Sequence, residues 1–111
     1  MKLVPHPFVQ RDIDGIVEHI VDTTGGDVAA ALKRLDEIDD LIASLLSNPW
    51  SGHRLSGVLD GWLVRHGGRD QMITMVFRPD DDRHSLFLAI VAFGGRDWLT
   101  RAPARRFGEL L

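Results

Sequence analysis

Arginine is the residue type whose number and position in this chain most clearly indicate chemistry. Residues 51–111 contain nine arginines, no lysine and seven acidic residues, whereas residues 1–50 contain four basic and nine acidic residues. The guanidinium group presents a planar set of N–H donors that fits a phosphate or a carboxylate. The net charge of −3 argues against a globally basic nucleic-acid-binding protein. It leaves open an arginine-bearing surface built by the second half of the chain.

Six of these arginines lie on or beside segments that we expect to form a sheet: Arg54, Arg65, Arg69, Arg78, Arg83 and Arg96. Strand alternation places Arg65 on the face opposite His66. If one face of the sheet covers helices, the other is expected to be an exposed, concave surface that bears arginines. Such a surface would recognise RNA phosphates or an acidic protein partner. The alternative is that these are ordinary surface arginines, paired with Asp60, Asp70 and Asp97.

The other residue types that could do chemistry form no motif with the required spacing. The five histidines are scattered and none forms an HExxH-type pair, so we predict no metal site. Ser51 and His53 are close in sequence, but the chain has no GxSxG nucleophile elbow. Residues 80–82 lack the glycine and later glutamate of a calcium loop and are expected to form a hairpin turn. The absence of cysteine excludes disulfides and cysteine-based zinc sites, and we expect no cofactor.

The first half of the chain is expected to form an antiparallel pair of helices. Apolar residues from position 8 to 20 recur at helical spacing, with Asp12 among the residues on the solvent side. Asp27 is a plausible N-cap for a second helix that ends at Asn48 and Pro49. The short Thr-Thr-Gly-Gly connection favours a hairpin. Five residues of the two apolar stripes are expected to be buried against a further layer: Ile16, Ile20, Leu35, Ile38 and Ile42.

The second half is expected to supply that layer as β-strands. Residues 61–66, 71–78 and 85–93 read as strands separated by glycine-rich and Pro-Asp turns, and the last of them is apolar enough to be buried on both faces. Residues 1–4 read as a short edge strand and residues 104–111 as a terminal helix. We therefore predict one α+β domain over residues 1–111, in the order β-α-α-β-β-β with a C-terminal α, in which the helical hairpin packs on a small, mainly antiparallel sheet. No signal peptide and no apolar run of ~18 residues is evident, so we expect a cytoplasmic protein without a membrane partner.

Three segments of the chain resemble the ParE/RelE superfamily, the toxins of bacterial type II toxin–antitoxin modules, also called plasmid stabilisation proteins. Residues 8–16 (FVQRDIDGI) are similar to the first helix of the family, which has a small or apolar residue, a charged pair and an isoleucine. Residues 45–57 (LLSNPWSGHRLSG) resemble its "L…NP…G…L.G" passage into the sheet. Residues 93–97 (FGGRD) are similar to its final strand and the His-Arg or Arg-Asp pair that follows. The resemblance covers about residues 1–101.

The resemblance implies one of two activities and an antitoxin partner. ParE-like members poison DNA gyrase by binding it, whereas RelE-like members cut messenger RNA on the ribosome. In the first case, the binding surface for the target or the antitoxin would include Arg65, Arg69, Arg78, Arg96 and Trp98. In the second, Arg54, Arg65, Arg78 and Arg96 would contact phosphate and His66 would act as acid or base. A homodimer or a toxin–antitoxin hetero-oligomer is the assembly that the family implies.

Several departures from the family pattern favour the ParE-like interpretation. The chain has no tyrosine and no lysine after Lys33, and the family's late histidine position falls on Gly95. A tyrosine–arginine pair of the middle strand appears here as Ile73 and Thr74. The acidic net charge also argues against docking on ribosomal RNA. A third reading, a family member without toxicity that serves as a small α+β scaffold, stays open.

Overall fold

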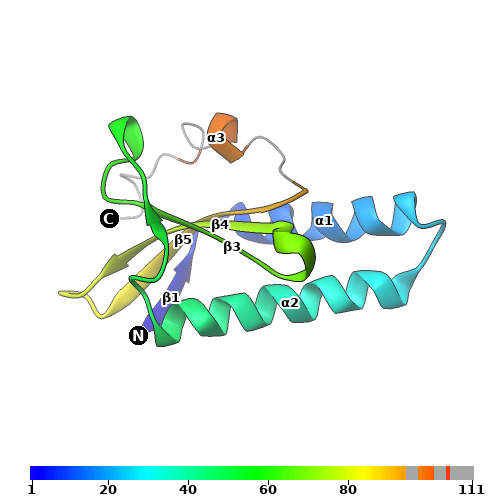
Figure 1. The fold of residues 1–111 in the computed structure, drawn as a ribbon, viewed down its shortest axis with the longest axis horizontal. Coiled ribbons are helices and arrows are strands. Elements are labelled where there is room, and N and C mark those ends of the chain that lie inside the picture. Colours follow the sequence, from blue (N-terminus) through cyan, green and yellow to red (C-terminus); the bar gives the residue numbers. More distant parts are fainter. Residues whose placement is uncertain (95–97, 102–104, 106–111) are drawn as a thin grey trace.

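The computed structural model describes residues 1–94, 98–101 and 105, and Figure 1 shows a helical hairpin packed against one sheet. The two long helices are α1 (Val9–Thr23) and α2 (Val28–Ser47), and α3 (Trp98–Arg101) is a single turn. The strands are β1 (Lys2–Pro5), β2 (His53–Arg54), β3 (Leu63–Gly67), β4 (Ile73–Asp80) and β5 (Ser85–Phe93). Two 3-10 turns, η1 (Gly57–Leu59) and η2 (Arg69–Gln71), interrupt the second half. The predicted α+β class is confirmed, as is the predicted order of the N-terminal strand, the helical hairpin and the three later strands β3, β4 and β5.

The five strands form one mixed sheet in the order β1-β5-β4-β3-β2. Only β1 and β5 are parallel, and the other neighbours are antiparallel. The apolar run at residues 85–93 is the central strand β5 and is buried on both faces, as predicted. Strand β3 starts two residues later than predicted, because Gly57–Leu59 and the following residues form a tight turn before it. The two-residue strand β2 was not predicted, since so short a segment has no periodicity of its own.

The helical hairpin covers one face of the sheet, as expected. Asp27 caps α2, and its carboxylate accepts a hydrogen bond from the Ala30 amide at 3.0 Å. The core on this side contains the predicted Ile16, Ile20 and Ile38. Leu35 and Ile42 are only half-buried, because at 3.6 residues per turn they lie toward one side of the arc that faces the sheet. The far end of the hairpin extends beyond the sheet (Figure 1).

The opposite face of the sheet is also buried, which corrects the expectation of an exposed arginine surface there. A second apolar cluster covers it: Leu59, Trp62, Val64, Val76, Phe87, Ala89, Ile90 and Ala92, with Leu55 and Trp98 packed against them. The turn around η1 and the short helix α3 lie over this face of the sheet. Trp98 of α3 is half-buried there. An irregularity in the pairing of β4 with β5, between Val76 and Phe77, places both Ala89 and Ile90 in this cluster. Within the described residues, no helix is long and apolar enough to cross a membrane.

Candidate functional site

The structure separates the arginines that the sequence grouped on one face. Strand pairing places Arg65 opposite Met75, on the face that the helices cover, whereas Arg78 pairs with Phe87 on the other face. Arg54 lies at the sheet edge in β2, and Arg69 lies in the turn η2. Arg96 and the predicted helix over residues 104–111 lie outside the described part, apart from residue 105. The predicted arginines that the structure describes therefore do not form one surface.

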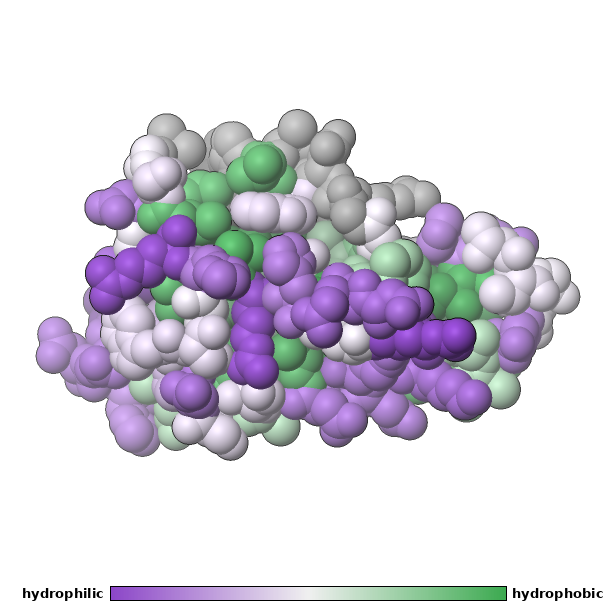
Figure 2. Space-filling model, in the orientation of Figure 1, coloured by the Kyte–Doolittle hydropathy of each residue, from purple (hydrophilic) through white to green (hydrophobic). Residues whose placement is uncertain are grey.

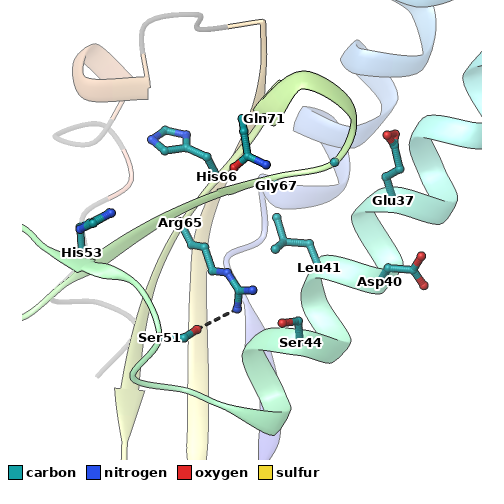
Figure 3. A pocket seen from close by; sticks show the side chains of 11 residues that line it. Glu37, Asp40, Leu41, Ser44, Ser51, His53, Arg65, His66, Gly67 and Gln71 are labelled. Atoms are coloured by element: carbon teal, nitrogen blue, oxygen red, sulfur yellow. Dashed lines mark hydrogen bonds between the residues drawn. The ribbon is translucent and has the colours of Figure 1, made fainter.

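A polar groove lies between α2 and the outer end of β3, and we call it the Arg65 groove (Figure 3). Its volume is about 640 Å³. Its walls are Glu37, Asp40, Leu41, Ser44, Ser51, His53, Arg65, His66, Gly67, Gly68 and Gln71. Of the residues proposed from sequence, it brings Arg65 and His66 together. His53 and Ser51, which form no motif in the sequence, join them because β2 pairs with β3.

Arg65 carries a positive charge that no carboxylate of the described residues neutralises. Its Nη1 donates to the Ser51 hydroxyl at 2.8 Å, and this contact turns the side chain toward the start of β2 (Figure 3). Arg34, Arg69, Arg83 and Arg105 form all the ion pairs of arginine seen in the described part. A half-buried guanidinium with spare N–H donors is a ready site for a carboxylate or a phosphate.

His66 lies beside Arg65 in sequence but points to the opposite face. Its Nδ1 is 2.8 Å from the hydroxyl of the buried Thr74 on β4, its cross-strand neighbour. This contact fixes the ring and leaves Nε2 free of it. His53 pairs with Val64, so it lies on the same face as His66 and one step along the sheet. The two exposed imidazoles therefore lie on one face of β3 and the Arg65 guanidinium on the other, although all three residues line the groove.

A strained turn that α2 holds in place lies at one end of the groove (Figure 3). Asp70 and Gln71 have φ angles of 56° and 58°, which L-residues rarely adopt. Glu37 of α2 accepts a hydrogen bond from the Arg69 amide at 2.7 Å, and its other oxygen lies 3.1 Å from Nε of Arg34. A Cβ on Gly67 would lie 2.9 Å from Leu41, so glycine allows β3 and α2 to approach closely. Sequence analysis predicted the turn but not its anchor, because nothing local distinguishes Glu37 from the other acids of α2.

Arg54 and Arg78 line a separate pocket at the other end of β3, together with Trp50, Leu55, Asp60, Gly61, Leu63 and Pro79. Its volume is about 400 Å³. A Cβ on Gly61 would lie 3.9 Å from the Arg78 guanidinium carbon, so that guanidinium lies close to the turn before β3. No arginine of the described residues pairs with Asp60, whereas Arg69 and Asp70 are 3.9 Å apart on the surface, and Asp97 lies outside the described residues. This second pocket offers another anion site, but not one continuous with the Arg65 groove.

Asp12 is a buried anchor that the helical pattern had placed on the solvent side. One oxygen accepts a hydrogen bond from the Val91 amide at 3.1 Å, and the other pairs with Arg105. Strand β1 pairs with β5 only as far as Leu88, so the Val91 amide lies beyond its reach. Arg105 also lies 5.5 Å from the ring of Phe8. The Asp12 carboxylate therefore accepts a hydrogen bond from the Val91 amide of the central strand β5, and its ion pair holds residue 105 against α1. Among the described residues, no group of three side chains could hold a metal ion.

Comparison with known proteins identifies the fold. The crystal structure of the toxin–antitoxin complex RelBE2 from Mycobacterium tuberculosis contains a chain that is 17% identical, with a TM-score of 0.58, over 83% of this chain and 95% of that one. A YoeB/ParE toxin from Agrobacterium tumefaciens is 23% identical, with a TM-score of 0.56, over 84% of this chain and 98% of that one. No protein-family model and no curated protein matches the sequence. The chain thus has the fold of these toxins, as the resemblance to the ParE/RelE superfamily predicted.

Proposed function

We propose that this protein is the toxin of a bacterial type II toxin–antitoxin module and that it acts by binding a target protein such as DNA gyrase. The observation that carries the proposal is the shared fold, which extends over nearly the whole length of both solved toxins. One of those structures is a toxin–antitoxin complex, which supports a cognate antitoxin as partner of this chain. A cytoplasmic location belongs to the same proposal, since a gyrase or an antitoxin is met there.

The distribution of charged groups supports binding rather than RNA cleavage. Phosphodiester cleavage needs several cations around one phosphate and an acid or base within hydrogen-bond reach of it. Arg65 lines one cavity, and Arg54 and Arg78 line another at the far end of β3. The sheet face between these cavities is filled by apolar side chains rather than by a polar cleft. A protein target would contact the half-buried Arg65 and Arg78 near the ends of their strands and the exposed Arg69 in the turn η2, with Arg96 and Trp98 contributing from the C-terminal end.

Induced expression in a bacterium tests this proposal. We expect growth arrest with filamentation and a DNA-damage response, and we expect co-expression of a small DNA-binding protein encoded beside the gene to relieve it. A matched control is Arg83→Gln, which alters an exposed arginine already paired with Asp80 in the β4–β5 turn. That control should remain toxic. Normal growth with folded protein present would contradict the toxin proposal and favour the non-toxic scaffold.

RNA cleavage is the second candidate, and one observation favours it. Arg65, His53 and His66 all line the same groove, although the two imidazoles lie on the face of β3 opposite to Arg65, and Thr74 orients His66. An imidazole as acid or base beside a guanidinium would suit cleavage of RNA through its 2′-hydroxyl. Rapid translation arrest with cuts at defined codon positions, lost in His66→Ala and retained in Arg83→Gln, would establish this activity instead. Filamentation without such cuts would exclude it.

A further inference from the structure

We propose that the pocket at the start of β3, which we call the Trp50 pocket, binds a free guanine nucleotide. Arg54 and Arg78 would hold its phosphates, and Trp50 and Asp60 its base. The volume of the pocket, about 400 Å³, falls within the range of about 300–1,000 Å³ that is typical of small-molecule sites. The inference goes beyond the proposed function, because it requires neither an antitoxin nor a toxin target.

The Trp50 pocket lies where β3 separates from β4. The pairing of these strands ends at Leu63 and Phe77, whereas β4 continues to Asp80. No described strand therefore covers this edge of β4 beyond Phe77. The chain before β3 instead folds into the turn around η1, at the same end of the sheet as the β4–β5 turn (Figure 1). This arrangement leaves a cavity at the edge of the sheet.

Two guanidinium groups without a partner line the pocket. Arg54 pairs with Leu63 on the face that the helices cover, and Arg78 pairs with Phe87 on the other face. The two side chains therefore reach the edge of the sheet from opposite sides. Within the part of the chain that the structure describes, neither guanidinium forms a hydrogen bond or an ion pair. Their free N–H donors can hold phosphate groups between them.

The turn before β3 is fixed and leaves one flank of Arg78 open. The Asp60 amide donates to the Gly57 carbonyl at 3.1 Å, which closes the turn. Gly61 has a φ angle of 91°, which L-residues rarely adopt, and a Cβ there would lie 3.9 Å from the Arg78 guanidinium carbon. Any other residue would be strained at this position and would place its side chain against the guanidinium. Glycine therefore keeps this flank accessible to a ligand.

Trp50 offers an aromatic surface for a base. Trp50 is 51% exposed, whereas Trp62 in the second apolar cluster is 3% exposed. Leu55, Leu63 and Pro79 supply apolar wall beside it. In Figure 2, strongly hydrophilic side chains border paler, less polar ones at the end of the molecule where β2 lies. An aromatic ring in one pocket with guanidinium groups suits a nucleotide, because its base stacks on the ring while its phosphates bind the cations.

Asp60 selects guanine among the bases. It lines the same pocket as Arg54 and Arg78 but forms an ion pair with neither of them. A ligand that fills the pocket must therefore satisfy a carboxylate as well as two cations. Guanine has two adjacent donors, N1–H and the 2-amino group, which match the two oxygens of a carboxylate. Adenine has an acceptor at N1, which a carboxylate repels.

The surroundings of the pocket favour a single nucleotide over an RNA strand. Asp80, Asp81 and Asp82 directly follow Pro79 in the chain, and Arg83 pairs with the first of them. No ion pair of Asp81 or Asp82 is seen among the described residues. The later phosphates of an RNA strand would be repelled by these carboxylates. A free nucleotide has no such continuation.

Titration of the ¹⁵N-labelled full chain with GDP, ADP and inorganic pyrophosphate tests the proposal. The chain has three tryptophans, whose indole N–H groups give separate signals. We expect GDP to shift the indole signal of Trp50 and the amides of residues 54, 60, 61 and 78. ADP should bind about fivefold more weakly, because it loses the contact with Asp60. Pyrophosphate should bind about tenfold more weakly, because it has no base to stack on Trp50.

Variants of the full chain test the role of each charge. Arg78→Gln should weaken GDP binding about tenfold, and Arg78→Lys, which keeps the charge, should bind GDP more tightly than Arg78→Gln. Asp60→Asn should abolish the preference for GDP over ADP. The matched control is Arg11→Gln, which removes the same charge near Phe93, at the other end of β5, and should bind GDP as the unaltered chain does. The amide spectrum of each variant reports whether it is folded.

Four results would overturn the inference. These are an unmoved Trp50 signal, equal affinity for GDP and ADP, pyrophosphate affinity equal to that of GDP, or tighter binding of the ribonucleotide UUGUUU than of GDP at the same residues. The last result would assign the pocket to RNA. None of these measurements depends on toxicity, so their failure would leave the proposed function intact, and normal growth on expression would leave this inference intact.

Discussion

The two faces of the sheet are equally buried but covered in different ways. On one face, two regular helices of 15 and 20 residues pack on Met75, Phe77 and their neighbours. On the other, a 3-10 turn of three residues and a single helical turn cover Val76 and Ile90. Apolar side chains fill both faces of this sheet, whatever the form of their cover. Charged side chains that could recognise a partner are therefore found at its edges and ends, where Arg65 and Arg78 lie.

The comparison also predicts different energetic consequences. The helices α1 and α2 pack on their face of the sheet as one cooperative unit. We expect that detaching them from the sheet would unfold the molecule. The irregular cover makes fewer main-chain hydrogen bonds and can open locally. The three predictions that follow test this contrast, from the largest expected effect to the smallest.

Replacing Ile38 by alanine should cause the largest loss of stability. Ile38 is 1% exposed and lies where α2 meets the sheet, so the substitution leaves a cavity that the paired helices cannot close. We expect the free energy of unfolding to fall by about 2–5 kcal/mol, measured by chemical denaturation. A loss below about 1 kcal/mol would show that the helical face is no more rigid than the other.

Replacing Leu59 by alanine tests the second face with a residue that is also buried. Leu59 belongs to the three-residue turn η1, which can settle into part of the space left behind. The expected loss is therefore near the lower end of the range for such changes, about 2–3 kcal/mol. Hydrogen exchange should accelerate at the amides of residues 55–62 more than at those of α2. Equal acceleration of both would contradict local opening.

A pair of glycine substitutions tests the close approach of β3 and α2 at the groove. In Gly67→Ala the added methyl group meets Leu41 at 2.9 Å, so we expect a loss of about 1–3 kcal/mol in the free energy of unfolding. Gly15→Ala is the matched control, since an added Cβ there has no atom within 4 Å. It lies inside α1 and should stabilise the protein by about 0.4–1 kcal/mol. Similar melting temperatures for the two variants would show that the groove wall is loose.

Much of the fold could be predicted because its signals are local. The helical spacing of Ile16, Ile20 and Ile38, the cap at Asp27 and the apolar run of β5 depend on short stretches of sequence and a fixed period. The half-buried Leu35 and Ile42 mark the limit of that reasoning, since periodicity identifies a stripe but not which part of it the sheet covers. Asp12 marks another limit, because a carboxylate on a helix reads as solvent-exposed until a distant strand amide and Arg105 are placed beside it.

The candidate site was predictable only in its components. Arg65, His66 and Arg78 stand out in the sequence as groups that could bind anions, and alternation correctly separated Arg65 from His66. Their assembly depended on contacts between residues far apart along the chain: the pairing of β2 with β3, the reach of Glu37 to the turn, and the covering of the second face by Leu59 and its neighbours.

The amino-acid sequence by itself determined the α+β class of the fold, the order of its two long helices and four of its strands, and the resemblance to toxins whose fold it shares. It did so because periodicity, caps and turns are encoded within a few residues of one another. Only the tertiary structure decided that the second face is closed, that the arginines divide between two cavities, and that Arg65 faces α2 across a groove. Those features arise from which strand lies next to which and how far each pairing extends, and no short stretch of sequence carries that information.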